Sequence, residues 1–142
     1  MHVNKDQILV KIDPRDYKIK LQQALAAQVG ASAGVNVGQS QIFTSSSNSS
    51  VAKAGVVSAQ ARLDKVKKDY DRYANLVKDG SITQQQFDQA KSDLEVAQAN
   101  LAAARDQYKA AVQQIGTTRD QLKVTNTGVN QRQVDVDYAS CN

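Results

Sequence analysis

The sequence predicts an all-α protein: a long two-stranded antiparallel coiled-coil hairpin with a short N-terminal β segment. Three observations predict this fold. Aromatic residues make up only 5% of the 142 residues and Trp is absent, so large side chains are too few to fill a thick globular core. An apolar heptad pattern runs along most of the chain, and it breaks near the middle around one glycine.

The second half of the chain carries the clearer heptad pattern. Alternate steps of three and four residues, starting at Phe87, meet a large residue every seventh position with a small or polar residue between. This spacing predicts one continuous helix whose apolar seam faces a partner helix. The predicted seam positions are Phe87, Ala90, Leu94, Ala97, Leu101, Ala104, Tyr108, Ala111, Ile115, Thr118, Leu122, Thr125, Val129, Arg132, Val136 and Ala139.

The first half repeats the pattern from Tyr17 to Val77 and keeps its phase through TSSSNSS (44–50). Composition alone predicts a linker at 44–50, because Ser and Asn favour turns over helix interiors. A loop has no reason to keep the heptad phase, so the pattern favours a continuous but locally weak helix. A break at 44–50 remains the alternative.

Folding the chain at Gly80 sets the two halves against each other in a defined register. Large residues then face small ones at nearly every level, for example Leu101 against Ala59, as interdigitated packing requires. The charged seam residue Arg132 faces the amide of Gln28, which we interpret as a register device. A slip of seven residues would keep the layers but move the pivot away from the glycine.

The residues around Gly80 have the chemistry of a helix-to-helix turn. Gly80 suits the left-handed position just after a helix. Thr83 and Gln86 have the spacing of a capping box for the second helix, and Ile82 with Phe87 has that of its hydrophobic staple. The sequence therefore predicts that the first helix ends and the second helix begins within a few residues.

At the other end, Asp13 and Pro14 form an N-cap followed by proline at the first helical position. The preceding residues 3–12 are rich in Val and Ile and read as a short strand or hairpin. That strand has no partner in a chain that is otherwise helical. The predicted organisation is a β segment over 1–13 and a helical hairpin over 14–142, with arm one at 14–78, the tip at 79–82 and arm two at 83–140.

Composition argues against several classes of function. The net charge is +4 and acidic and basic residues alternate, which favours a solvated surface over a nucleic-acid partner. With one His (His2) and one Cys (Cys141), the chain offers no catalytic, cofactor or metal set, and a two-helix seam offers no pocket. We therefore predict no enzymatic activity. No apolar run is long enough to span a membrane.

Two segments resemble a known family. VNKDQILVKIDPRDY (3–17) is similar to the first half of the lipoyl-like domain of periplasmic adaptor proteins, or membrane fusion proteins, of the haemolysin-secretion and multidrug-efflux type. Asp6 stands where the turn glycine of that family usually lies. The tip resembles the family pattern R-Y-x-x-L…I-S-x-x-x-x-D, with Thr in place of Ser. The matching residues are Arg72, Tyr73, Leu76, Ile82, Thr83 and Asp88.

The resemblance implies that residues 1–13 are the first half of a lipoyl-like domain, whose closing half lies outside this sequence. It implies a periplasmic adaptor of a tripartite efflux or type I secretion system, attached to the inner membrane. Its partners would be an outer-membrane channel, an inner-membrane transporter and further copies of itself. The full-length protein would therefore be a homo-oligomer.

The resemblance also implies roles for three tip residues. Arg72 would donate hydrogen bonds at the mouth of the channel, Leu76 would fill a groove there, and Thr83 would add a hydrogen bond. Leu76 lies one position off the seam, so we expect it to point outward. Each residue also has a plain structural role open to it: Thr83 as a helix cap, Arg72 in a pair with Asp69 or Asp71, and Leu76 as an ordinary exposed leucine.

A structural spacer or stalk from another cell-envelope assembly is the alternative function. The heptads suit it equally well, whereas the strand before Asp13 and the tip pattern favour the adaptor.

Overall fold

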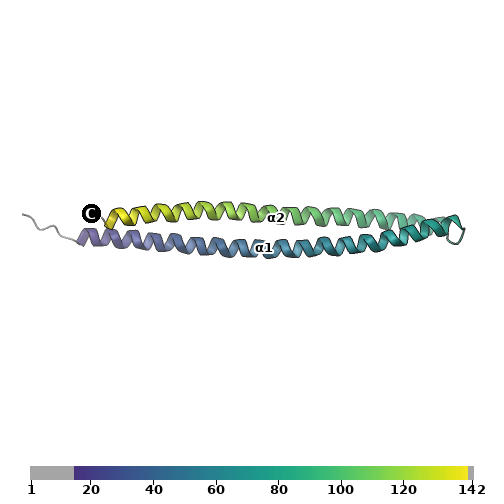
Figure 1. Ribbon diagram of the computed structural model, residues 1–142, viewed down its shortest axis with the longest axis horizontal. Helices are drawn as coiled ribbons and strands as arrows, with labels where there is room; N and C mark the ends of the chain where they lie inside the picture. The colour runs from purple at the N-terminus through teal and green to yellow at the C-terminus, as the bar shows by residue number, and fades with distance from the viewer. Residues whose placement is uncertain (1–14, 141–142) are drawn as a thin grey trace, which may run out of the picture. The chain divides into compact units, whose positions relative to one another are not determined.

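A computed structural model of the chain describes residues 15–140. The chain has two helices, α1 (Arg15–Lys78, 64 residues) and α2 (Gln84–Ser140, 57 residues) (Figure 1). The described residues fall into two compact units, which we describe separately: residues 39–120, and residues 15–38 with 121–140. The prediction of two long helical arms is confirmed. The predicted β segment and the Asp13–Pro14 helix start lie outside the described residues.

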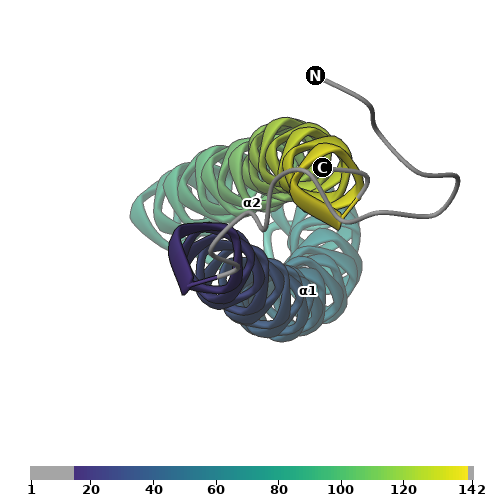
Figure 2. The ribbon, with the colours of Figure 1, turned by 90° about the vertical axis from the view of Figure 1, so that its left-hand side faces the viewer.

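In the unit of residues 39–120, the α1 and α2 segments lie side by side and are joined by the turn at 79–83 (Figures 1 and 2). Its buried apolar residues are the predicted seam residues Ala90, Ala97 and Leu101. The cross-helix contacts Tyr70–Phe87, Gln60–Arg105 and Ser45–Thr118 join residues whose numbers fall along α1 as they rise along α2, so the two segments are antiparallel. This unit is therefore the closed end of a helical hairpin with a thin apolar seam.

The serine-rich run at 44–50 is helical, within α1. Its seam residue Ser49 is buried, with 8% of its surface exposed. The hydroxyls of Ser47 and Ser50 donate to the carbonyl oxygens four residues before them, at 3.1 and 3.2 Å. Because these hydroxyls bond within the helix, they do not compete for the backbone in a turn. The prediction of a continuous helix is confirmed.

In the unit of residues 15–38 and 121–140, the two segments pack in the predicted register. Gly38 lies against Leu122, so closely that a Cβ placed on the glycine would be 2.8 Å from Leu122 Cδ1. A seven-residue slip would instead have placed Gly38 opposite Ile115 or Val129. The large-against-small layers predicted from the sequence are therefore present at this level.

The predicted pairing of Arg132 with Gln28 is wrong. The Gln28 side chain donates to the Gln133 side chain, whereas Arg132 is exposed and pairs with Asp135 on its own helix at 3.3 Å. A long, flexible cation can leave a seam position and stay hydrated, and burying it against a neutral amide would cost its hydration. Tyr17 also departs from the predicted seam, since it is 40% exposed.

Neither α1 nor α2 is apolar enough over a sufficient length to cross a membrane.

Candidate functional site at the hairpin tip

The tip turn closes with a Schellman motif after the last helical residue of α1, Lys78. The Ser81 amide donates to the Leu76 carbonyl at 2.9 Å, and the Gly80 amide donates to the Val77 carbonyl at 3.2 Å. Gly80 has a φ of +69°, in the left-handed region that residues with a Cβ rarely adopt. The predicted role of Gly80 is confirmed, and the turn is a defined structure.

Thr83 begins α2 through the predicted capping box. Its hydroxyl accepts from the Gln86 amide at 3.3 Å, while the Gln86 side-chain oxygen accepts from the Thr83 amide at 3.0 Å. The Gln86 amide also donates to the Thr83 carbonyl oxygen at 3.1 Å, so the box satisfies the Thr83 amide and gives the Gln86 amide a second acceptor. Thr83 is exposed, so its capping role and contact with a partner are compatible.

Replacing Thr83 by Ala should lower the free energy of unfolding by about 1 kcal/mol, because the Gln86 amide loses its side-chain acceptor. Thermal or denaturant unfolding followed by circular dichroism measures this loss. Thr83→Ser keeps the hydroxyl and should unfold like the wild type. Equal stability of the Ala and Ser variants would contradict a capping role.

Aromatic packing between α1 and α2 next to the turn stabilises it. The Tyr70 and Phe87 rings lie across the seam with centroids 5.4 Å apart and planes tilted by 31°. Such an offset pair contributes about 1 kcal/mol beyond the area it buries. Ile82 and Phe87 are both half-buried, as a hydrophobic staple requires. The tip is therefore held by packing as well as by its caps.

Arg72 is exposed, and its guanidinium donates to the Asp69 carboxylate one turn earlier at 2.9 Å. The side chains of Arg72 and Asp69 are 66% and 35% exposed, so water screens the pair and its net contribution to stability is small. The plain alternative predicted for Arg72, a pair with a neighbouring aspartate, is thus the arrangement that the structure shows. A partner carboxylate could replace Asp69 at little cost.

Leu76 departs from its expected orientation, since it is half-buried and does not point fully outward. A residue one step before the seam residue Val77 lies at the flank of the interface, where a side chain as long as leucine covers part of the seam. Leu76 therefore offers a partner an edge of apolar surface next to the turn.

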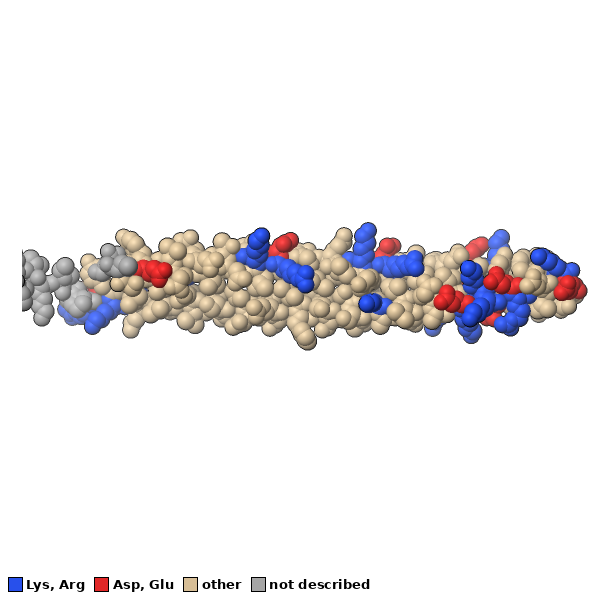
Figure 3. Space-filling model, in the orientation of Figure 1, with Lys and Arg blue, Asp and Glu red and all other residues tan. Residues whose placement is uncertain are grey.

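Charges of both signs gather around the tip. Figure 3 shows acidic and basic side chains clustered at this end and over α2. They include Lys78 and Asp79 at the turn and Asp88 in the first turns of α2, where its carboxylate accepts from the Gln84 side chain at 3.0 Å. A mixed charge pattern suits directional contacts with polar groups better than attraction to a polyanion.

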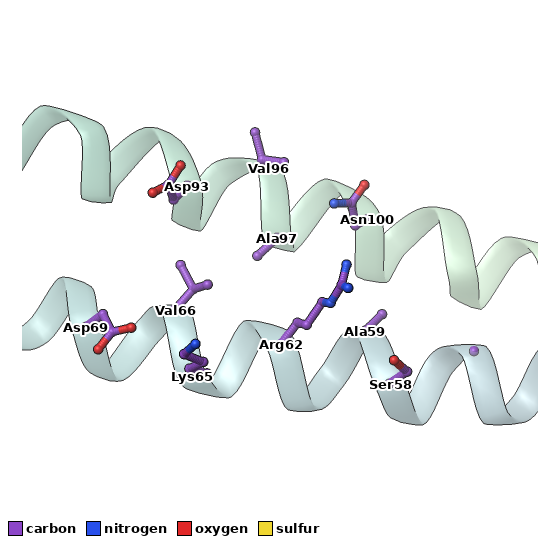
Figure 4. Close-up of a pocket in the computed structure, with 11 residues that line it drawn as sticks. Ser58, Ala59, Arg62, Lys65, Val66, Asp69, Asp93, Val96, Ala97 and Asn100 are labelled. Carbon is purple, nitrogen blue, oxygen red and sulfur yellow. The ribbon is translucent and has the colours of Figure 1, made fainter.

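A groove of about 690 Å³ lies along one flank of the unit of residues 39–120, between α1 and α2. Arg62 reaches from α1 across the floor of the groove toward Asn100, and Asp69 and Asp93 lie at one end (Figure 4). This groove corrects the expectation that a two-helix seam offers no pocket. None of the three predicted tip residues lines it, and its lining holds no His or Cys.

Within residues 15–140, no three His, Cys, Asp or Glu side chains gather in a way that could hold a metal ion. The residues of the tip can donate and accept hydrogen bonds at an exposed turn whose conformation is fixed by its caps and packing.

Two heptad-patterned helices closed by a doubly capped turn define a helical hairpin domain, whose chemistry lies in surface contacts. Comparison with known proteins identifies the domain. Residues 15–124 match the family model of the EmrA alpha-helical hairpin domain, and the chain belongs to this family of membrane fusion proteins.

One curated relative is the "Colistin resistance protein EmrA" of Acinetobacter baumannii strain ATCC 17978, which is 38% identical over 100 residues. The match covers 70% of this chain and 28% of that protein, so the chain spans less than a third of its relative. No solved structure matches the chain.

Proposed function

We propose that this chain is the hairpin of a periplasmic adaptor in a tripartite efflux or type I secretion system. In this function the adaptor is attached to the inner membrane and bridges an inner-membrane transporter to an outer-membrane channel. The hairpin spans periplasmic space and its tip docks on the channel. Residues 1–13 form the first half of a lipoyl-like domain, and copies of the full-length protein assemble into a homo-oligomer.

The observation that carries the proposal is the construction of the tip. Gly80, the capping box and the Tyr70–Phe87 pair fix the turn, so the residues it presents need no ordering on binding. Arg72 and Thr83 lie exposed at this fixed end, and Leu76 is partly accessible at its flank. The chain belongs to the EmrA hairpin family, and the docking role that we propose for the tip rests on analogy with that family.

Within the proposed contact, each side chain has one chemical task. Arg72 exchanges its screened bond to Asp69 for a backbone carbonyl or carboxylate of the channel. Leu76 extends its exposed edge into an apolar groove. The Thr83 hydroxyl accepts from the Gln86 amide and donates to the Gln86 side-chain oxygen at 3.3 Å, and it exchanges this donated bond for an acceptor on the channel.

The test compares Leu76→Ser and Arg72→Asp in the full-length adaptor with the same changes in the 142-residue chain. Each variant should weaken channel binding by about tenfold or more, because an end-on contact concentrates its energy in few residues. Since the curated relative is named for colistin resistance, survival on colistin is the first phenotype to measure. Binding of purified channel to the adaptor is the direct readout.

Stability controls separate docking from folding. Leu76→Ser should cost the chain about 1 kcal/mol of unfolding free energy, since the side chain is only half-buried. Asp69→Asn removes the ion pair but leaves Arg72 in place, so it should keep full channel binding. Unchanged channel binding and resistance in both Leu76→Ser and Arg72→Asp would contradict the docking role.

A structural spacer or stalk is the second candidate function. It is favoured by the finding that Arg72 and Thr83 already have partners within the chain. A spacer needs only a closed turn, so tip substitutions that keep the fold would leave its function unchanged. The channel-binding measurement above decides between the two functions.

A further inference from the structure

Weak helix formers gather at one level of both helices within the unit of residues 39–120. Residues 44–50 of α1 consist of Thr, Ser and Asn, and residues 113–118 of α2 contain one Gly and two Thr. All four residue types favour a helix interior less than Ala does. The Ser45 and Thr118 hydroxyls lie 3.5 Å apart, so the two runs lie side by side. We call residues 44–50 and 113–118 together the polar belt.

Hydroxyl groups on both helices of the polar belt donate to the backbone of their own helix. On α1, the Thr44, Ser47 and Ser50 hydroxyls donate to the carbonyl oxygens four residues earlier, at 3.0, 3.1 and 3.2 Å. On α2, the Thr117 and Thr118 hydroxyls do the same at 3.3 and 2.8 Å. Such bonds slightly destabilise a helix and often bend it, because the carbonyl oxygen shares its lone pairs with a second donor. Both helices therefore carry the same local weakness at the same level.

The seam adds little stability across the polar belt. Its seam residues Ser45, Ser49 and Thr118 carry hydroxyls, and Ser49 is buried without contributing a large apolar side chain. Ile115 is the large apolar residue of this level, and it is only half-buried. Nearer the tip, by contrast, the seam holds Leu101, which is 5% exposed. Because stabilisation rises with the apolar area removed from water, the two helices hold each other less firmly in the belt.

The tip side of the same unit provides a contrast within one chain. Residues 60–66 of α1 and 94–100 of α2 contain no Gly, Ser or Thr, and each run has a leucine at a seam position. Segments with few buried apolar contacts open at a lower free-energy cost than well-packed segments do. The polar belt should therefore open more often than these two runs, although it lies in the interior of both helices.

We propose that the polar belt opens as one cooperative unit in the folded chain and is the point at which the hairpin bends. When one run of the belt loses its helical backbone, the other run loses its seam partner, so the two runs open together. This bending point rests on the proposed function for its purpose: it lets a docked tip keep its contacts while the rest of the adaptor tilts. The opening itself does not depend on that function.

Hydrogen exchange of the full 142-residue chain, read by mass spectrometry, measures the opening. We expect the protection factors of residues 44–50 and 113–118, corrected for intrinsic exchange rates, to be at least about tenfold lower than those of 60–66 and 94–100. Equal protection in the belt and in the two tip-side runs would overturn the proposal.

A single substitution on α2 tests whether the two runs open together. Gly116→Ala favours the helix and fits the structure, since nothing lies within 4 Å of a Cβ placed there. It should raise protection about fivefold in 113–118 and also in 44–50 on the other helix. Gly128→Ala is the matched control, because it lies on α2 outside the belt and its Cβ also has nothing within 4 Å. It should leave protection in the belt unchanged.

Two results of this comparison would contradict cooperative opening. Gly116→Ala that protects 113–118 but leaves 44–50 unchanged would show that the two runs open separately. An equal rise in belt protection with Gly128→Ala would show that the exchange reports the stability of the whole chain.

Bending is measured by electron–electron distance distributions between spin labels on α1, on a Cys141→Ser background. Gln39→Cys with Val57→Cys spans the belt, and Val57→Cys with Asn75→Cys spans the tip side. The three residues are exposed and both pairs are 18 residues apart, roughly 27 Å along a helix, so the pairs are matched. We expect a broader distribution for the pair across the belt, narrowed by Gly116→Ala. Equal widths for the two pairs would contradict the bending point. None of these measurements uses the channel, so they fail or succeed independently of the docking role of the tip.

Discussion

Replacing Leu101 by Ala is expected to lower the free energy of unfolding of the chain by about 3 kcal/mol, a large part of the stability of a thin two-helix seam. Leu101 is 5% exposed and is the most buried apolar side chain among the described residues. The register places it against Ala59, which has no side-chain length to fill the space that leucine leaves. The helices are joined by stiff, continuous backbone, so the cavity cannot fully collapse.

Denaturant unfolding followed by circular dichroism measures the loss. Leu25→Ala is the matched control, because Leu25 is 43% exposed and the same atoms are removed from a site that water already reaches. This control should cost well under 1 kcal/mol, since alanine also favours the helix. If Leu25→Ala destabilised the chain as much as Leu101→Ala, the apolar seam would not be where the stability lies.

The seam itself was predictable from the sequence because a heptad pattern has one geometric solution. A residue that recurs at alternate steps of three and four lies on one face of a helix whatever surrounds it. Ala90, Ala97, Leu101 and Val136, all predicted seam residues, are the buried apolar residues of the described chain. Even the serine run obeyed the phase, and its seam residue Ser49 is buried.

The turn was predictable for a different reason. Gly80 and the Thr83–Gln86 box are short-range devices whose atoms lie within a few residues of each other, so their spacing in sequence determines their contacts. No knowledge of the packing between the helices was needed to expect them.

Side chains at the edges of the seam were less predictable. Arg132 stands at a seam position in sequence, but its length lets it reach Asp135 and remain in water. Leu76 stands one position off the seam, but it is half-buried. For such residues the outcome depends on side-chain rotamers and hydration, which a periodic pattern does not encode.

Among the described glycines, Gly38 should be the one where a larger residue destabilises the chain most. A Cβ at Gly38 would lie 2.8 Å from Leu122 Cδ1, so Gly38→Leu cannot fit without separating the helices or displacing Leu122. We expect a loss of about 3 kcal/mol in the free energy of unfolding, at the upper end for overpacking. Gly30→Leu is the control on the same helix, since nothing lies within 4 Å of a Cβ there. It should stabilise the chain by about 0.5 kcal/mol through helix propensity.

A size swap across the seam tests the register at the same position. Leu122→Ala alone opens a cavity and should cost about 2 kcal/mol, whereas Gly38→Leu with Leu122→Ala restores one large residue against one small residue. We therefore expect the double variant to be more stable than either single variant, with a coupling energy of about 2 kcal/mol or more in the unfolding double-mutant cycle. In a register slipped by seven residues, Gly38 would face Ile115 or Val129. Rescue of Gly38→Leu by Ile115→Ala or Val129→Ala, and not by Leu122→Ala, would therefore contradict the packing described for this unit.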